Sequence, residues 1–500
     1  MKRFFTFILL IAITGAAFAA TMDAKVRTVP KETQELVFKK PKEGLPAVVK
    51  HLTTGAGSTS AKVKVLHDWI CDNIAYDTDV FTVGVRRQDY ETVLKKQKAI
   101  CAGYANLMNE MCRLAGVECI RISGHSKGVG YKGALGKKPD HDWNAVNLSG
   151  KWQLIDVTWD AGLVDFTTFV KRYSTQWLYL TPEQFIFSHL PEDDKYQYLK
   201  EPKTPEQFVK EPYVPGIFFE YGLAFASVKT MPDYTNRLTE TVQYEFKATR
   251  SNVSVMSDLY DKAGNTGVIN NATWIDKTAG KLVARYDVPN AQLYRGRLLA
   301  RNRNETKNPT FISIAEYEGS ILPQAQQLVA EKKVTQKEYE YLEQSYSKVV
   351  ENGRYYIIED LFDSPRNTAV TKILKLEEEN SNFEEVLYFE LQAADGYTGF
   401  GSDALRFPTP YTAFIDATNT SLVTPAVGTL QKGSSQNFVI ETKDFTSVGV
   451  VIDGGIVSAQ KDAKGAFELT VTVPSDTDAL AVYGSKNGKN FSGLWTYQIE

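Results

Sequence analysis

The pattern of the chain changes near residue 216, and this change limits what it can fold into. Before it, helical spacing alternates with strand-like runs, whereas short alternating stretches such as VQYEFKA, KLVARYDV and FELTVTV follow it. Four prolines between residues 202 and 215 mark a linker. At 500 residues the chain is too long for one hydrophobic core. We therefore expect an α+β domain followed by all-β sandwich modules.

The β-rich part contains a weak internal repeat. Residues 280–289 and 465–474 each place Gly and Pro nine residues apart with alternation between them, at an offset of 185 residues. This favours two related sandwich modules, at residues 216–385 and 386–500. A segment of helical composition, residues 323–353, interrupts the first module, and the sequence gives it no function.

Residues 1–19 have the pattern of a secretory signal peptide. Lys2 and Arg3 precede the apolar run FFTFILLIAITGAAFA, and Ala-Phe-Ala at its end suits a cleavage site. A membrane anchor is the alternative, although this run is short for a span. No other stretch approaches about 18 consecutive apolar residues. We expect an exported protein (secreted, periplasmic or at the cell surface) without a membrane span after signal removal. Residues 20–59 are expected to form a loose lead-in to a domain at residues 60–205.

Composition argues against nucleic acid as a partner. The formal net charge is −3 and the lysines are scattered among acidic residues, whereas nucleic-acid binding requires a basic face. Metal sites find no support either, because the chain has no HExxH, paired CxxC or EF-hand spacing. We therefore expect no metal and no cofactor.

All four cysteines, Cys71, Cys101, Cys112 and Cys119, fall in the first quarter of the chain. A disulfide-stapled scaffold would spread them along the chain. Two alternatives remain for the other three cysteines: one disulfide among Cys71, Cys112 and Cys119, or buried free thiols.

Cys101 begins a predicted helix in the segment KAICAGYANLMNEMC, and this helix is expected to end at Gly116. An earlier helix is predicted from Ser60. Unpaired amide groups at a helix N-terminus favour a thiolate, and Ala102 and Gly103 leave room for a substrate carbonyl. Taken alone, this pattern favours a buried structural cysteine, because a nucleophile also needs a base.

His141 is the predicted base. HDWNAVNL and KWQLIDVTW are strand-like runs joined by Ser149-Gly150, the pattern of a hairpin. With a two-residue turn, His141 lies opposite Thr158 and Trp143 opposite Asp156. Asp156 then becomes the diagonal neighbour of His141 on one face of the ladder, within side-chain reach. A carboxylate there would orient the imidazole and stabilise its charged form.

Other residues near this hairpin compete for the same roles. His125 is the rival base, but no carboxylate is obviously placed beside it. His189, in SHLPEDD, is expected to be structural, and Asp140 and Asp142 should point away from His141. The Gly- and Lys-rich loop at residues 126–139 has two interpretations, a substrate lid or an ordinary solvated loop.

These segments resemble the transglutaminase-like superfamily. KAICAGYANL is similar to its nucleophile motif at Cys101, and HDWNAVNLSGKWQLIDVTWD is similar to its His-x-Trp-Asn and Trp-x-Leu-x-Asp motifs at His141 and Asp156. YLTPEQFIFSHLPEDDKYQYL resembles the branch that includes kyphoscoliosis peptidase, and EPYVPGIFFEYGLAF resembles that branch's entry into its β-rich part. The resemblance covers roughly residues 60–200.

The resemblance implies an α+β papain-like core, followed here by two immunoglobulin-like sandwich modules. It implies a Cys101–His141–Asp156 triad that attacks a carbonyl or carboxamide and forms a thioester. The Cys101 amide and one more donor would hold the oxyanion; Gln88 is a candidate, with a solvated loop residue as the alternative. Animal transglutaminases need calcium, but no acidic cluster here matches theirs.

Two aromatic residues have expected positions around this triad. Trp143 is expected to wall the site, and Tyr104 to pack beneath Cys101. Trp152 is expected to lie in the core.

Three functions follow, in order of preference. The first is a cysteine peptidase acting on a protein or peptide, and the second is a protein-glutamine transamidase. The third is a non-enzymatic cell-surface or matrix binding protein, in which the β modules contact a cell-envelope or matrix partner.

Overall fold

The computed structural model describes residues 22–302 and 383–500, apart from residues 86, 129–130, 165–167, 262–271, 279, 402–404, 453 and 464, and a few residues between 303 and 382. The predicted signal peptide lies outside the described residues. So does the segment 323–353, except for Gln326, Val329, Ala330 and Gln336, which are helical. In the part of the chain that is described, we find no helix with the length and apolarity needed to span a bilayer.

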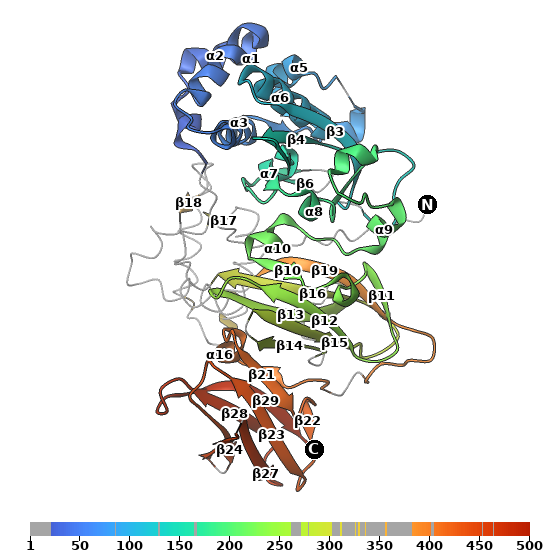
Figure 1. Cartoon of the computed structure of the whole chain (residues 1–500), viewed down its shortest axis with the longest axis vertical. Coiled ribbons are helices and arrows are strands. Elements are labelled where there is room, and N and C mark those ends of the chain that lie inside the picture. The colour runs from blue at the N-terminus through green and yellow to red at the C-terminus, as the bar shows by residue number, and fades with distance from the viewer. Residues whose placement is uncertain are drawn as a thin grey trace. The chain divides into compact units, whose positions relative to one another are not determined.

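The segment before residue 59 is helical, so the prediction of a loose lead-in is wrong. It forms η1 (Ala24–Thr28), α1 (Lys31–Lys39) and α2 (Pro41–Thr53), ahead of α3 (Thr59–Asn73). Its buried residues, among them Val37 and Leu52, share one core with those of α3 and α6. In the ribbon, α2 lies beside α3 and α6 (Figure 1). Pro41 is the first residue of α2, where a missing amide hydrogen costs nothing. The cap of α3 is Ser58 rather than Ser60.

The helix that carries Cys101, α6 (Cys101–Leu114), contacts an antiparallel five-stranded sheet. The strand order is β8-β5-β4-β3-β9. Asn144 Nδ2 on β4 donates to the Ala105 carbonyl of α6 at 3.0 Å. The bounds are β3 (Cys119–Ser126), β4 (His141–Leu148), β5 (Lys151–Ile155), β8 (Leu178–Leu180) and β9 (His189–Pro191).

The β4–β5 hairpin has the predicted register over part of its length. Leu148 pairs with Lys151 and Asn144 with Ile155, and the two turn residues have φ values of 56° and 88°, as a type I′ turn requires. Beyond Ile155 the prediction is wrong, because α7 (Val157–Ala161) begins there and Thr158 does not pair with His141.

Short elements complete the N-terminal domain. They are β1 (Ala75–Tyr76), α4 (Val80–Val83), α5 (Tyr90–Lys96), β2 (Lys98–Ala99), β6 (Gly162–Val164), β7 (Phe169–Lys171), α8 (Pro182–Phe185), η2 (Asp194–Gln197), α9 (Pro205–Lys210) and α10 (Gly216–Glu220). β1 and β2 pair in parallel directly before Cys101, so the start of α6 is tied to the end of α3.

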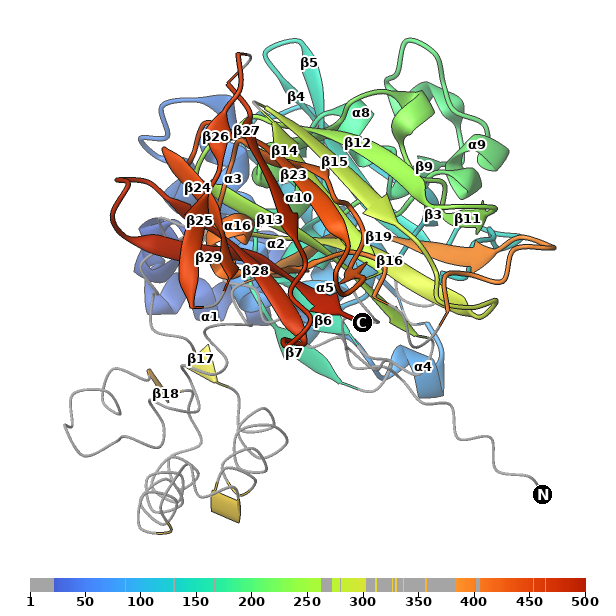
Figure 2. The same ribbon diagram turned by 90° about the horizontal axis from the view of Figure 1, so that it is seen from below.

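The C-terminal part is rich in β-sheet, as predicted. One sheet has the order β10-β12-β15-β14-β21-β23-β27-β26, a second β11-β19-β16-β13, and a third β20-β29-β28-β24-β25. The neighbouring strands β12, β15 and β14 of the first sheet are labelled in Figure 2. The two parts of the sequence repeat contain β15 (Lys281–Tyr286) and β27 (Phe467–Thr472). β19 (Glu384–Ala393) pairs with β11 (Thr235–Leu238), so the predicted boundary at residue 385 cuts a strand. An immunoglobulin-like topology stays a prediction.

The remaining strands of these sheets have the following bounds. They are β10 (Leu223–Phe225), β12 (Val242–Ala248), β13 (Val253–Asp261), β14 (Thr273–Thr278), β16 (Leu293–Asn302), β20 (Thr409–Pro410), β21 (Thr420–Thr424), β23 (Ser435–Thr442), β24 (Ser447–Ile452), β25 (Gly455–Ser458), β26 (Gln460–Lys461), β28 (Ala479–Ser485) and β29 (Phe491–Ile499).

Candidate active site

Cys101 is the first residue of α6. Ile100 is the N-cap residue and has an extended backbone, and Cys101 is 8% exposed. The first amide groups of a helix have no carbonyl partner within it and carry partial positive charge. The thiol therefore stands where an anionic sulfur, or an oxyanion formed beside it, is stabilised.

The space beside Gly103 is filled rather than open, which corrects one expectation. A Cβ on Gly103 would lie 2.5 Å from Gln88 Oε1 and 2.8 Å from Val93 Cγ2. Gln88 Oε1 accepts a hydrogen bond from the Ile100 amide at 3.1 Å. This contact gives Gln88 a structural role at the start of α6, and its predicted part in the oxyanion hole stays a prediction.

His141 and Asp156 lie together, as the hairpin argument expected, although a helix start rather than a strand pair places the carboxylate. His141 Nε2 donates to Asp156 Oδ2 at 2.6 Å. Asp156 is the N-cap of α7, and its Oδ1 accepts from the amides of Thr158 at 2.9 Å and Trp159 at 3.2 Å. Because Nε2 faces Asp156, Nδ1 is the ring atom that remains for the Cys101 thiol.

The charges of this group are coupled. Burial alone would lower the pKa of His141, but the Asp156 carboxylate and the nearby Cys101 outweigh it and raise that pKa well above its usual value. Burial opposes the ionised form of Asp156, yet His141 and His189 hold the pKa of its carboxyl well below the usual range. The site therefore favours an imidazolium beside a carboxylate.

His189 is the site residue that sequence reasoning missed. Its Nε2 lies 3.2 Å from Asp156 Oδ2, the oxygen that His141 also contacts. His189 is 1% exposed, and burial lowers its pKa to about 4. It comes from β9, 33 residues after Asp156 in the chain, and no local pattern signals this approach.

Aromatic rings surround the two histidines. The ring of Trp159 stacks on His141 with centroids 5.2 Å apart, and that of Trp143 lies 6.1 Å away. Trp143 thus lies beside His141, and its role as a wall of the site stays a prediction. Tyr104 is buried and its hydroxyl donates to the Ile74 carbonyl at 2.8 Å, which is a structural contact. Trp152 is half-buried and stacks on Tyr198.

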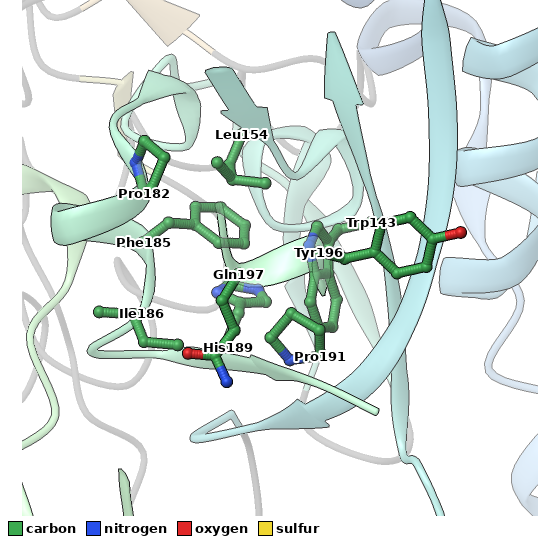
Figure 3. Close-up of a pocket in the computed structure, with 9 residues that line it drawn as sticks. All are labelled: Trp143, Leu154, Pro182, Phe185, Ile186, His189, Pro191, Tyr196 and Gln197. Carbon is green, nitrogen blue, oxygen red and sulfur yellow. The ribbon is translucent and has the colours of Figure 1, made fainter. Parts of the chain in front are cut away.

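A small hollow of about 10 Å³ adjoins His189 (Figure 3). Cys101 and Asp156 are not among its lining residues, so this hollow is not a cleft at the thiol. The lining residues are Trp143, Leu154, Pro182, Phe185, Ile186, His189, Pro191, Tyr196 and Gln197.

His141, Asp156 and His189 together offer three atoms of the kind that bind metals, all within 4.8 Å of one another. Two ligands of one tetrahedral zinc ion lie about 3.3 Å apart, given zinc–nitrogen distances near 2.05 Å. The 2.6 Å between His141 Nε2 and Asp156 Oδ2 is shorter than this. The geometry is that of a hydrogen-bonded set, and the expectation of no metal stays a prediction.

The remaining predicted candidates lie elsewhere. His125 Nδ1 is 3.9 Å from Asp140 Oδ2 and makes no hydrogen bond within the described chain. Asp142 forms an ion pair with Arg121. At the start of the loop 126–139, Lys127 is buried and its Nζ donates to the carbonyls of residues 211 and 212. The four cysteines are free.

A third buried histidine, His67, fixes α7 from the opposite end. His67 Nδ1 lies 3.0 Å from Asp68 Oδ1, and its Nε2 lies 3.1 Å from Asp160 Oδ2. Carboxylates accept but do not donate, so both ring nitrogens carry protons and His67 is an imidazolium. Asp160 belongs to α7, the helix that Asp156 caps. The ion network of His67 therefore ties α7 to α3.

Comparison with known proteins gives matches to the N-terminal part of the chain. A family model described as the transglutaminase-like superfamily matches residues 46–157. Kyphoscoliosis peptidase of Mus musculus is 37% identical over 212 residues, covering 41% of this chain and 32% of that protein. The Homo sapiens protein of the same name is 38% identical over 194 residues, covering 38% of this chain and 29% of that protein. The matches thus span about a third of these relatives.

The chain therefore carries a transglutaminase-like domain. That domain lies on the branch of the superfamily that includes kyphoscoliosis peptidase, as its motifs predicted. Among solved structures, the chain is similar to a TGase, with 20% identity over 30% of this chain and 38% of that one, and a TM-score of 0.20. That likeness is too low to add to the assignment.

Proposed function

We propose that this protein is a thiol enzyme that cleaves peptide bonds through Cys101, His141 and Asp156. The observation that supports it most is the hydrogen bond from His141 to Asp156 at 2.6 Å, together with the interaction of His141 with a cysteine at a helix N-terminus. These are the three roles of nucleophile, base and orienting group.

In the first half-reaction the Cys101 thiolate attacks the substrate carbonyl carbon, and the carbonyl oxygen becomes an oxyanion. The Cys101 amide is placed to donate to that oxygen. When the carbon–nitrogen bond breaks, the His141 imidazolium gives its proton to the leaving amine, and a thioester remains on Cys101.

In the second half-reaction water attacks the thioester while His141 takes one of its protons. The carbon–sulfur bond breaks, the acid product leaves and the thiolate returns. An amine in place of water would give transamidation, the second candidate function. The relatives at 37% and 38% identity are named peptidases, which favours hydrolysis.

Incubation with casein and a fluorescent primary amine separates these outcomes. Hydrolysis yields new peptide fragments, whereas transamidation yields labelled casein of unchanged or higher mass. Cys101→Ala is the control, because it removes the sulfur and leaves the buried residues of α6 in place. If wild type and C101A give neither product, or the same products, the enzyme proposal fails and a binding protein is the better account.

The proposed setting is extracytoplasmic, with the N-terminal segment acting as a signal peptide. Two observations support it: the segment's composition and the β-rich C-terminal part, which we propose folds as immunoglobulin-like sandwiches and contacts a cell-envelope or matrix partner. Expression of the full chain with a C-terminal tag, followed by N-terminal sequencing of the exported form, tests this. Cleavage after residue 19 is expected.

A further inference from the structure

We infer that His189 is a positioning residue of the proposed triad: it donates to Asp156 Oδ2, the oxygen that His141 also contacts, and so keeps that oxygen aimed at His141. The inference rests on the proposed function, since it assigns a role within the same site. It differs from the sequence expectation, in which His189 was structural.

The Asp156 carboxylate has no access to water, so its donors decide its state. It is completely buried, and its four donors are the amides of Thr158 and Trp159 and the rings of His141 and His189. A buried carboxylate stays ionised only when such donors replace water. In the proposed reaction His141 also transfers protons to and from the substrate, whereas His189 takes no part in proton transfer.

The neighbours of His189 fix which nitrogen carries its proton. Its Nδ1 lies 2.8 Å from the Ser188 hydroxyl. His189 is neutral near pH 7, because burial lowers its pKa to about 4, so it has one N–H. Only the arrangement with that hydrogen on Nε2 gives Asp156 a donor. The single Ser188 hydroxyl hydrogen, which also faces the Phe185 carbonyl oxygen at 3.1 Å, then points to the closer Nδ1.

The ring of His189 is also held in place by packing. Phe185 stacks on it with centroids 4.0 Å apart, and the ring of Trp159 lies 4.4 Å away. β9 reaches this position because Gly124 on β3 has no side chain; a Cβ there would lie 2.2 Å from the Leu190 carbonyl oxygen. The backbone and the packing thus aim one nitrogen at one oxygen.

Several titratable groups face this carboxylate from the surrounding elements. His141 and His189 contact it directly, and three tyrosines lie within electrostatic range: Tyr76 of β1, Tyr104 of α6 and Tyr213 after α9. The pKa of each tyrosine is raised by burial, so these hydroxyls stay neutral. Loss of the His189 donor would leave Asp156 Oδ2 less firmly held and weaken its support of the His141 imidazolium, so the thiolate–imidazolium pair would form at a higher pH.

The test is the pH dependence of Cys101 alkylation by iodoacetamide in the full chain. His189→Phe removes the donor and retains a flat ring, whereas His189→Gln retains an N–H donor. We expect H189F to react about tenfold more slowly near pH 7, with the acid limb of its profile moved up by about one pH unit. H189Q should restore both toward wild type. His51→Phe, on α2, is the matched control and should change neither.

Each outcome decides the inference. Wild-type rate and profile in folded H189F overturn it, and so does an H189Q profile that matches a defective H189F. If H189F does not fold, Ser188→Ala is used; it removes the hydroxyl that sets the tautomer, and an unchanged profile there also overturns the inference. A wild-type Cys101 that reacts no faster than a free thiol contradicts the proposed function instead, and so distinguishes the two failures.

Discussion

The carboxylate of Asp156 caps α7 with one oxygen and accepts from His141 Nε2 at 2.6 Å with the other. The start of a helix therefore fixes the orientation of the proposed catalytic base. The cap holds Oδ1 whether or not substrate is present, so Oδ2 is presented to His141 without a search of side-chain conformations. The amides of α7 also favour the negative charge that stabilises an imidazolium.

Substitution of Asp156 by Asn should abolish most activity while the fold is retained. Asn caps helices about as well as Asp, but it carries no charge to stabilise the His141 imidazolium. We expect casein cleavage to fall by about 10²–10⁴-fold, with a circular dichroism spectrum like that of wild type. Asp156→Ala removes the cap as well and should destabilise the fold by about 1 kcal/mol more. Wild-type cleavage by D156N would refute the role given to this residue.

The same variant should change the titration of His141. In wild type Asp156 helps to raise the pKa of His141 well above 6.5, so the imidazolium persists through neutral pH and is lost only on the alkaline side. In D156N the His141 imidazolium should lose its proton at a pH at least one unit lower than in wild type. NMR titration of imidazole resonances, assigned with His141→Gln, measures it. Equal titration in the two proteins would contradict the coupling.

The His67 network should make stability depend on pH in a defined direction. Burial opposes its charge, but Cys71 and the hydrogen bonds to Asp160 and Asp68 raise the pKa of His67 well above 6.5. Its contribution is therefore complete below about pH 6.5 and is lost as pH rises through the folded-state pKa. His67→Gln removes this term.

Urea unfolding of wild type and H67Q between pH 6 and pH 10 tests this. The free-energy difference between them should shrink by at least about 1.4 kcal/mol, the equivalent of one pKa unit. A constant difference across that range would show that His67 is not charged in the folded protein.

Lys127 should have the opposite dependence. Burial lowers its pKa to about 7, so between pH 7 and its ordinary value of 10.5 the unfolded chain binds the extra proton and stability rises with pH. Lys127→Met should gain stability relative to wild type near pH 7, and the gain should shrink by about 2–4 kcal/mol toward pH 10.5. Lys132→Met, in the same loop, is the control. A gain that does not depend on pH would contradict this assignment.

Local sequence patterns predicted part of the fold and part of the candidate site. Ser149 and Gly150 set the hairpin register, because a two-residue turn with both φ values positive permits one pairing. The same pattern failed after Ile155, where Val157, Thr158 and Trp159 have the composition of a strand but form a helix behind an Asp cap. Tertiary contacts, including that of Asp160 with His67, outweigh strand propensity there.

Other features depended on contacts that the sequence does not encode locally. The sequence did not predict α1 and α2, because proline disfavours a helix interior; Pro30 and Pro41 instead stand at the starts of these helices. His189 was missed because its role depends on β9 pairing with β3, more than sixty residues earlier in the chain. Periodicity describes a strand, but it does not identify the strand's neighbour.

The most direct test of the account is the rate at which iodoacetamide alkylates Cys101 near neutral pH, measured by mass spectrometry of the four cysteine peptides in wild type and His141→Gln. If Cys101, His141 and Asp156 form a triad, Cys101 should react first in wild type, ahead of the buried Cys71 and Cys112. In H141Q it should react at least tenfold more slowly than in wild type. A Cys101 that reacts no faster than a free thiol, at the same rate in both proteins, would contradict it.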